Sequence, residues 1–150
     1  MKLGEVFRFE IEYRLRRGST WVYAGLLLGL SFLMLHIANG GSSRMNSPEM
    51  VATISSIVSL VGMLVTAALF GEAATRDIQS RLHPLMYTAP MRTAEYLGGR
   101  FLGTLVVNAV LLLGIPLGQL AASWMPYLDG RMFGPFIPGA YVQPFLLLLL

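Results

Sequence analysis

Few side chains in this sequence are suited to catalysis, and their positions exclude several kinds of active site. The single lysine is Lys2, so no phosphate-binding loop with its lysine is present in this stretch. His36 and His83 lie far apart and neither belongs to an HExxH motif, and the absence of cysteine removes thiolate ligands and thiol nucleophiles. No serine or carboxylate is paired with a base at a recognisable spacing. We therefore predict a segment that is not an enzyme and that itself binds no metal or cofactor.

One polar stretch interrupts the apolar sequence and is better suited to docking than to catalysis. It reads RDIQSRLHPLMYTAP, from Arg76 to Pro90. Glu72 and Arg76 are four residues apart, as are Asp77 and Arg81, with the acid first in each pair. Such pairs stabilise a helix by about 0.2–0.5 kcal/mol each. A charged helix is therefore predicted here, continuing from the apolar block that precedes it.

Apolar side chains follow the end of this predicted helix and would be exposed to solvent. Pro84 disfavours helical geometry at the residue before it, so the helix is expected to end near Leu82. Leu85 and the apolar residues after it are exposed unless a partner covers them, which suggests a docking surface. The alternative is a solvated loop on the lipid headgroups, with Arg92 and Arg100 as anchors. The residues alone leave both interpretations open.

Most of the sequence is apolar and lies in blocks that are long enough to cross a membrane. Of the 150 residues, 55% are hydrophobic and 13% are charged, whereas a soluble domain carries about 25% charged residues. Blocks 21–38, 51–70 and 101–125 meet the requirement of about 20 apolar residues for a spanning helix, and a fourth begins at 141. We predict an all-α, polytopic membrane protein with a loop at 71–100. The fourth block, 141–150, is still running at its last residue, so we expect an N-terminal fragment of a longer protein.

The basic residues predict the orientation of the chain. Five precede the first span (Lys2, Arg8, Arg14, Arg16, Arg17), four lie between the second and third (Arg76, Arg81, Arg92, Arg100), and one lies in each other loop (Arg44, Arg131). This asymmetry places the N-terminus and the 71–100 loop in the cytoplasm. The net charge of +3 therefore reflects topology, and nucleic acid is not an expected partner.

The region before the first span admits more than one interpretation. Residues 8–16 alternate apolar and charged side chains like a strand, but apolar residues also recur at four-residue spacing from Leu3 to Leu15. A helix satisfies its own backbone at a membrane surface, so we predict an interfacial helix at 3–17 that turns at Gly18 into the first span. The first block with "ANG" at 38–40 also resembles a cleaved signal peptide. The long leading region with its three glutamates, and the further spans, favour a retained span.

Several residues within the spans suggest how the helices pack. Glycines four residues apart occur as Gly25 with Gly29, Gly99 with Gly103, and Gly114 with Gly118. Small residues at this spacing let helix backbones approach closely in lipid, so these are predicted packing positions. Pro116 is expected to bend the third span. The polar side chains Asn108 and Gln119, and the hydroxyls between Thr53 and Ser59, either line a pathway or bond within the protein.

The polar stretch and its flanks resemble a known group of transporters. GEAATRDIQSRLHPLMYTAPMRTAEYLGGRFLG, residues 71–103, resembles the intracellular loop of ATP-binding-cassette (ABC) permeases of the type-2 exporter class. The matching positions are Arg76 with Asp77, Leu85, Thr88 with Pro90, Arg92, and residues 96–100, and the intervening Ala89 departs from the tighter turn. FRFEIEYRLRRGSTWVY and MPYLDGRMFGPFIPGAYVQP are similar to the elbow helix with its first span and to an outer loop. The greatest similarity is to large bacterial permeases with a zinc-aminopeptidase-like domain, of which this sequence contains no part.

This resemblance implies a permease subunit of an ATP-driven exporter in the plasma (inner) membrane. The 71–100 loop would be the coupling helix that rests in a groove of a cytoplasmic ABC ATPase subunit. The implied coupling residues are Arg76, Asp77, Leu82, His83, Pro84, Leu85, Tyr87, Thr88, Pro90 and Arg92. ATP and Mg would bind to the partner ATPase, and a second permease half or copy would complete the transporter. The alternatives are a membrane anchor or scaffold for a downstream peptidase-like domain, and a solitary small membrane protein.

Overall fold

The computed structural model describes residues 2–38, 44–79, 93–125 and 133–149, and this part of the chain is helical and contains no strand. Its helices are α1 (Lys2–Leu15), α2 (Gly18–Ile37), α3 (Pro48–Gln79), α5 (Thr93–Leu112), α6 (Gly114–Ser123) and α7 (Pro138–Leu149). Three stretches are long and apolar enough to cross a membrane: Gly18–Ile37, Pro48–Arg76 and Ala94–Ser123. The all-α prediction is thus confirmed. The three predicted spans overlap these stretches, which are called the first, second and third span below; that they cross a membrane stays a prediction.

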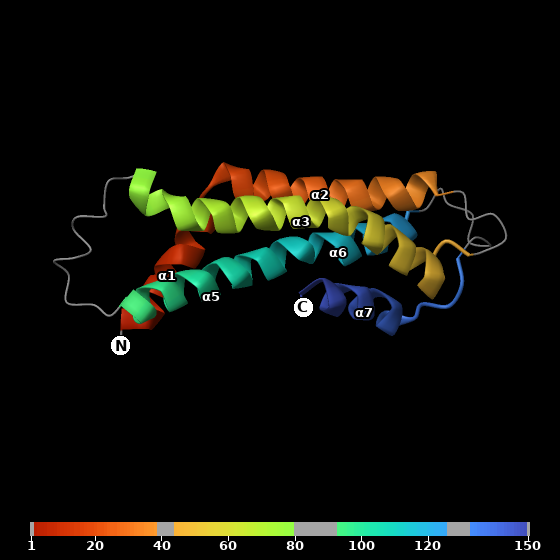
Figure 1. Cartoon of the computed structure of the whole chain (residues 1–150). Coiled ribbons are helices and arrows are strands. Elements are labelled where there is room, and N and C mark those ends of the chain that lie inside the picture. Colours follow the sequence, from red (N-terminus) through yellow and green to blue (C-terminus); the bar gives the residue numbers. More distant parts are fainter. Residues whose placement is uncertain (1, 39–43, 80–92, 126–132, 150) are drawn as a thin grey trace.

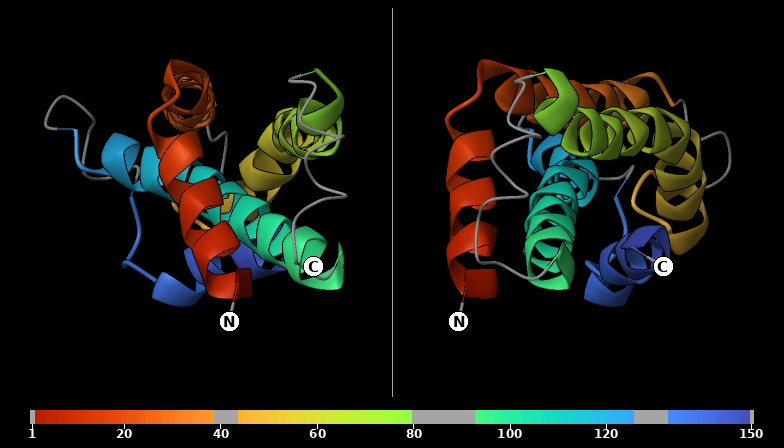
Figure 2. Two further views of the ribbon diagram at one scale, coloured as in Figure 1. Left: turned by 90° about the vertical axis from the view of Figure 1, so that its left-hand side faces the viewer. Right: turned by 60° about the vertical axis from the view of Figure 1, so that its left-hand side comes forward.

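The N-terminal segment is a helix and not a strand. α1 ends at Leu15, the backbone is extended at Arg17, and α2 begins at Gly18. Thr20 Oγ1 donates a hydrogen bond to the carbonyl oxygen of Arg14 at 2.7 Å, which satisfies an acceptor that the end of α1 would otherwise leave open. α1 therefore turns sharply away from α2 and lies alongside the beginning of α5 (Figures 1 and 2).

The second and third spans both depart from a simple apolar helix. α3 continues beyond the apolar block to Gln79, as the acid and arginine pattern predicted. The predicted helix end near Leu82 lies outside the described residues. In the third span, Leu113 separates α5 from α6. Pro116 has no N–H for the Leu112 carbonyl and its ring crowds that group, so the expected distortion of this span takes the form of an interruption one turn before the proline.

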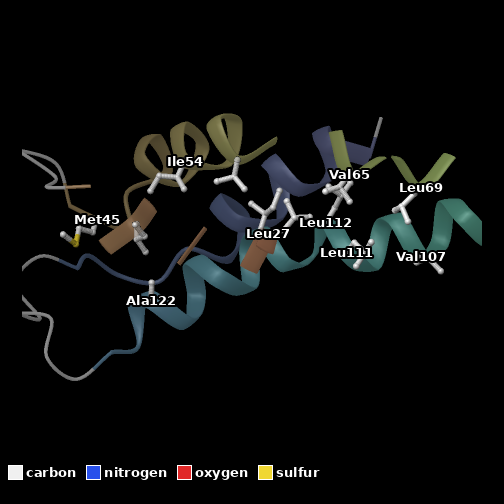
Figure 3. Packing of buried hydrophobic residues seen from close by; sticks show 12 residues of the cluster. Leu27, Met45, Ile54, Val65, Leu69, Val107, Leu111, Leu112 and Ala122 are labelled. Carbon is white, nitrogen blue, oxygen red and sulfur yellow. The ribbon is translucent and has the colours of Figure 1, made fainter. Parts of the chain in front are cut away.

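An apolar core runs along the bundle between α2, α3, α5 and α6 (Figure 3). Leu27 in α2, Val58 in α3 and Ile115 in α6 are completely buried in it. Large apolar side chains also cover the outside, where Leu60 is 64% exposed and Leu64 71% exposed. A chain that is apolar inside and outside suits a lipid environment, in which the backbone polar groups find their partners inside the helices.

Glycines in the third span lie at the closest helix contacts. Gly99 and Gly103 lie against α1, and Gly114 and Gly118 lie against α2. A Cβ atom on Gly103 would lie 2.8 Å from the Cβ atom of Glu10 in α1, and one on Gly118 would collide with the backbone carbonyl of Leu28 in α2. The close approach of α1 to α5 and of α2 to α6 therefore requires residues without side chains.

The glycines of the first span have a different environment. Among the described residues, no neighbouring atom lies within 4 Å of the position that a Cβ atom would take on Gly25 or Gly29. The two glycine pairs of the third span make contacts within this chain, whereas the pair in α2 faces open space.

Alanine substitutions should separate these two environments. We expect Gly118→Ala to destabilise the protein by about 1–3 kcal/mol, because the new methyl group meets a backbone carbonyl that only a shift of α2 can relieve. Gly29→Ala adds the same methyl group in open space and should be neutral or stabilise by up to about 1 kcal/mol, since alanine favours helix. Thermal unfolding in detergent measures both. A melting temperature for Gly118→Ala at or above that of Gly29→Ala contradicts the packing argument.

Candidate functional site: a buried carboxylate joining three helices

The carboxylate of Glu10 lies where α1, α3 and α5 meet, and it is the centre of an ion cluster. Glu10 is only 1% exposed. Arg14 Nε donates to Glu10 Oε1 at 2.9 Å. Arg76 reaches both oxygens, with NH2 to Oε2 at 2.7 Å and NH1 to Oε1 at 3.3 Å. Two-point binding of a carboxylate by a guanidinium is among the stronger and more directional ion pairs in proteins.

The local sequence explains how this carboxylate is positioned. Glu10 and Arg14 are four residues apart on α1, so both lie on one helix face. The Glu10 side chain passes close to Gly103 of α5, where a larger residue would block it. Arg14 extends further and donates from NH2 to the carbonyl oxygen of Leu69 in α3 at 3.0 Å. Burial lowers the pKa of Arg14, the Glu10 carboxylate opposes that shift, and the guanidinium remains charged.

Aromatic and basic side chains from α1 and α5 surround the cluster. The guanidinium of Arg76 lies 4.5 Å from the ring centroid of Tyr13, a cation–π contact. Arg100 is 5% exposed and donates from NH1 to the hydroxyl of Tyr96 at 3.0 Å. Its burial does not fit the headgroup-anchor interpretation of this arginine. A cavity of about 250 Å³ lies beside Glu10, Arg76, Tyr96 and Arg100.

A second ion pair ties α3 to the turn between α1 and α2. The sequence suggested that Glu72 pairs with Arg76 along α3. In the structure Glu72 binds Arg17 beside that turn, and Arg76 binds Glu10. α1 lies close enough to α3 to offer a carboxylate in a poorly solvated position, where attraction between charges is stronger than in an exposed pair on one helix. Helix packing thus pairs Glu72 and Arg76 with residues outside α3, whereas the sequence predicted that they pair with each other.

Most of the coupling residues implied by the family resemblance cannot be placed. Arg76 is part of the ion cluster, and Asp77 lies in the last turns of α3. The others lie outside the described residues: Leu82, His83, Pro84, Leu85, Tyr87, Thr88, Pro90 and Arg92. Arg76 is therefore the implied coupling residue for which the structure shows a contact with another helix.

Glu10 was not identified from the sequence as a functional residue. Its spacing to Arg14 follows the same acid-first, four-residue rule that was applied to Glu72 and Arg76. That rule identifies a pair and gives no information on burial. Its position opposite Gly103 depends on the packing of α1 against α5, which the sequence did not predict.

Polar side chains within the spans bond mainly inside the protein. Gln119 Nε2 donates to Ser55 Oγ at 3.1 Å between α6 and α3. Thr66 Oγ1 donates to Asn108 Oδ1 at 2.9 Å between α3 and α5. The hydroxyls of Thr53, Ser56 and Ser59 donate to carbonyl oxygens of their own helix. The internal-bonding interpretation therefore accounts for most of these groups, and Ser55 also lines a groove.

The arrangement around Glu10 is suited to holding helices together. Among the described residues, no three histidine, cysteine, aspartate or glutamate side chains gather in a group that could hold a metal ion. Comparison with known proteins adds no assignment: no family model, no curated protein and no solved structure matches this chain.

Removing the Glu10 charge should have a much larger effect than removing its exposed counterpart. We expect Glu10→Gln to destabilise the protein by about 3–5 kcal/mol, because two arginines then lack their compensating charge in a poorly solvated position. Glu12 makes the matched control: it lies on the same helix and binds Arg16 at the same four-residue spacing, but is 52% exposed. Glu12→Gln should cost less than about 1 kcal/mol. Equal shifts in thermal unfolding for the two variants would show that the cluster is energetically unimportant.

Proposed function

We propose that this chain is part of the permease subunit of an ATP-driven exporter of the type-2 ABC class, and that residues 71–100 couple it to a cytoplasmic ATPase. The observation that supports this most directly is the pair between Arg76 and Glu10. Arg76 lies near the end of α3, at the start of the predicted docking segment, and Glu10 lies in a different helix. A force on that segment would therefore reach α1 as well as α3.

The proposed mechanism follows the contacts away from this pair. ATP hydrolysis in the partner would displace the docking segment and with it the last turns of α3. Arg76 would pull on the Glu10 carboxylate and so on α1. α1 packs closely on Gly99 and Gly103 of α5, so its movement would carry the third span with it. Three helices would thus respond as one body, because closely packed interfaces transmit displacement.

The proposal includes an orientation and further partners. The excess of arginine before the first span and in the 71–100 loop supports a cytoplasmic position for these segments. The proposed location of the protein is the plasma (inner) membrane. ATP and Mg would be bound by the ATPase subunit, and a second permease half or copy would complete the transport path.

An interface variant tests the permease proposal against the anchor alternative. Protein tagged at its N-terminus and purified from native membranes should carry an ATPase subunit with a phosphate-binding loop, identified by mass spectrometry. We expect Leu85→Asp to reduce that association at least about tenfold, because a charge in an apolar docking contact is costly to desolvate. Unchanged association, or a protein that carries no ATPase, contradicts the permease proposal and favours a membrane anchor.

In the same complex, binding of the ATPase and stimulation of its activity can be measured separately. Arg76→Gln removes the link to Glu10 and leaves Leu85 intact, so the ATPase should remain bound. We expect the stimulation of ATPase activity by the permease to fall at least about fivefold, in the range of typical coupling energies. Arg16→Gln, at an exposed pair on α1, is the control that should leave stimulation unchanged.

The absence of native cysteine in this sequence allows a direct test of orientation. Single cysteines replace Ser43, in the loop after the first span, and Thr88, in the 71–100 loop. A membrane-impermeant maleimide should label Ser43→Cys in intact cells and Thr88→Cys only after permeabilisation, with the modified peptide identified by mass spectrometry. The reverse pattern would place the predicted docking segment outside the cell and overturn the proposed coupling.

A further inference from the structure

A second cavity lies between α3 and α7, away from the Glu10 cluster. Its volume is about 250 Å³, and its polar lining includes Ser55, Ser56 and Ser59 of α3 and Gln143 of α7. Leu147 and Leu148 of α7 add apolar surface. None of the described residues that line it is charged, although they include hydroxyl and amide groups. This groove therefore combines hydrogen-bonding groups with an apolar wall inside a membrane-type bundle.

The hydrogen-bonding capacity of this groove is only partly used inside the protein. Ser55 Oγ accepts a bond from Gln119 Nε2 at 3.1 Å, and among the described residues it donates no hydrogen bond. Gln143 is exposed, and its carboxamide has no partner among the described residues. The groove thus retains donors and an acceptor that a ligand could use.

A proline in α7 removes one helix hydrogen bond beside the same groove. Pro144 lies inside the helix and has no N–H. The carbonyl of Ala140 therefore lacks the donor that a helix normally supplies four residues later. Both residues line the groove. Free polar groups are costly in a membrane, so a ligand that satisfies them gains affinity.

We infer that the groove between α3 and α7 binds an uncharged amphiphile with a hydroxyl or amide head and a short alkyl chain. The head would accept a hydrogen bond from the Ser55 hydroxyl and bond to the Gln143 carboxamide. The alkyl chain would lie on Leu147 and Leu148. The lack of charge in the lining disfavours ions, which would lose hydration without compensation. This binding does not depend on an ATPase partner, so it stands or falls separately from the proposed exporter function.

Photolabelling tests this site. The probe is an octanol that carries a photoreactive diazirine, added to the purified protein in phosphatidylcholine vesicles. We expect saturable adducts on the α3 and α7 peptides that line the groove, displaced by excess unlabelled octanol. A diazirine-bearing octane without the hydroxyl should label these peptides more weakly. Adducts that do not saturate, or that spread evenly over the lipid-facing helices, overturn the inference, since they report partition into the bilayer.

Matched variants make the test specific for the hydrogen-bonding groups. Ser55→Ala and Gln143→Leu should each weaken probe affinity roughly fivefold through loss of one hydrogen bond. Gln143 is exposed, so its substitution leaves the packed core unchanged. Thr53→Val is the control, because Thr53 lies on α3 outside the groove lining and donates to the Glu49 carbonyl at 2.8 Å. Equal labelling of all four proteins contradicts the proposed site.

Competition identifies the source of the amphiphile. Dioctanoylglycerol, a lipid with a free hydroxyl, and octanol are each added to the labelling reaction. Displacement by dioctanoylglycerol at lower membrane concentration than octanol assigns the groove to a neutral lipid, and the opposite order assigns it to a small alcohol. Displacement by neither contradicts a hydroxyl-binding site.

Discussion

A carboxylate that is taken out of water must be matched by positive charge, and Glu10 imposes this requirement on three helices at once. Arg14 meets it from the same helix and Arg76 meets it from α3, while Gly103 of α5 leaves the space that the Glu10 side chain occupies. Loss of either arginine leaves the Glu10 charge poorly compensated, and a larger residue in place of Gly103 displaces the Glu10 side chain. The position of α1 relative to the bundle is therefore determined by electrostatics and close packing together, and the proposed transmission from the docking segment depends on both.

The two ends of the bundle are held in different ways. At one end, ion pairs join α1 and the turn after it to α3, through Arg76 and through Glu72. At the other end, neutral hydrogen bonds connect the loops, since Asn46 exchanges two bonds with the backbone of Gly134 at 2.9 and 2.6 Å. Between the ends, α2 and α6 are in contact at Gly118 without side chains between them. Among the described residues, the ion pairs lie at the end where the proposed ATPase would act.

The proposed amphiphile groove lies toward the end of the bundle where Asn46 and Gly134 are hydrogen-bonded. Its hydrogen-bonding groups include Ser55, which accepts a bond from Gln119 of α6, and it lies beside a proline within α7. The groove and the ion cluster involve opposite parts of α3, which extends from Pro48 at one to Arg76 near the other. If the exporter proposal holds, this one helix connects the ATPase-facing end to a site for an uncharged ligand, and occupancy at one end can bias the other only through α3 and its neighbours.

The sequence by itself determined the helical class, the three long apolar stretches, the extension of α3 past its apolar block and the break near Pro116. These features follow from hydrophobic length and local backbone chemistry, which act within a few residues. Tertiary structure decided which charges meet. Glu72 and Arg76 were expected to pair along one helix, but their observed partners are Arg17 and Glu10. It also separated the glycines of α5 and α6, which meet other helices, from Gly25 and Gly29, which do not. Burial and partner choice depend on how whole helices pack, and residues far apart in the chain determine that packing.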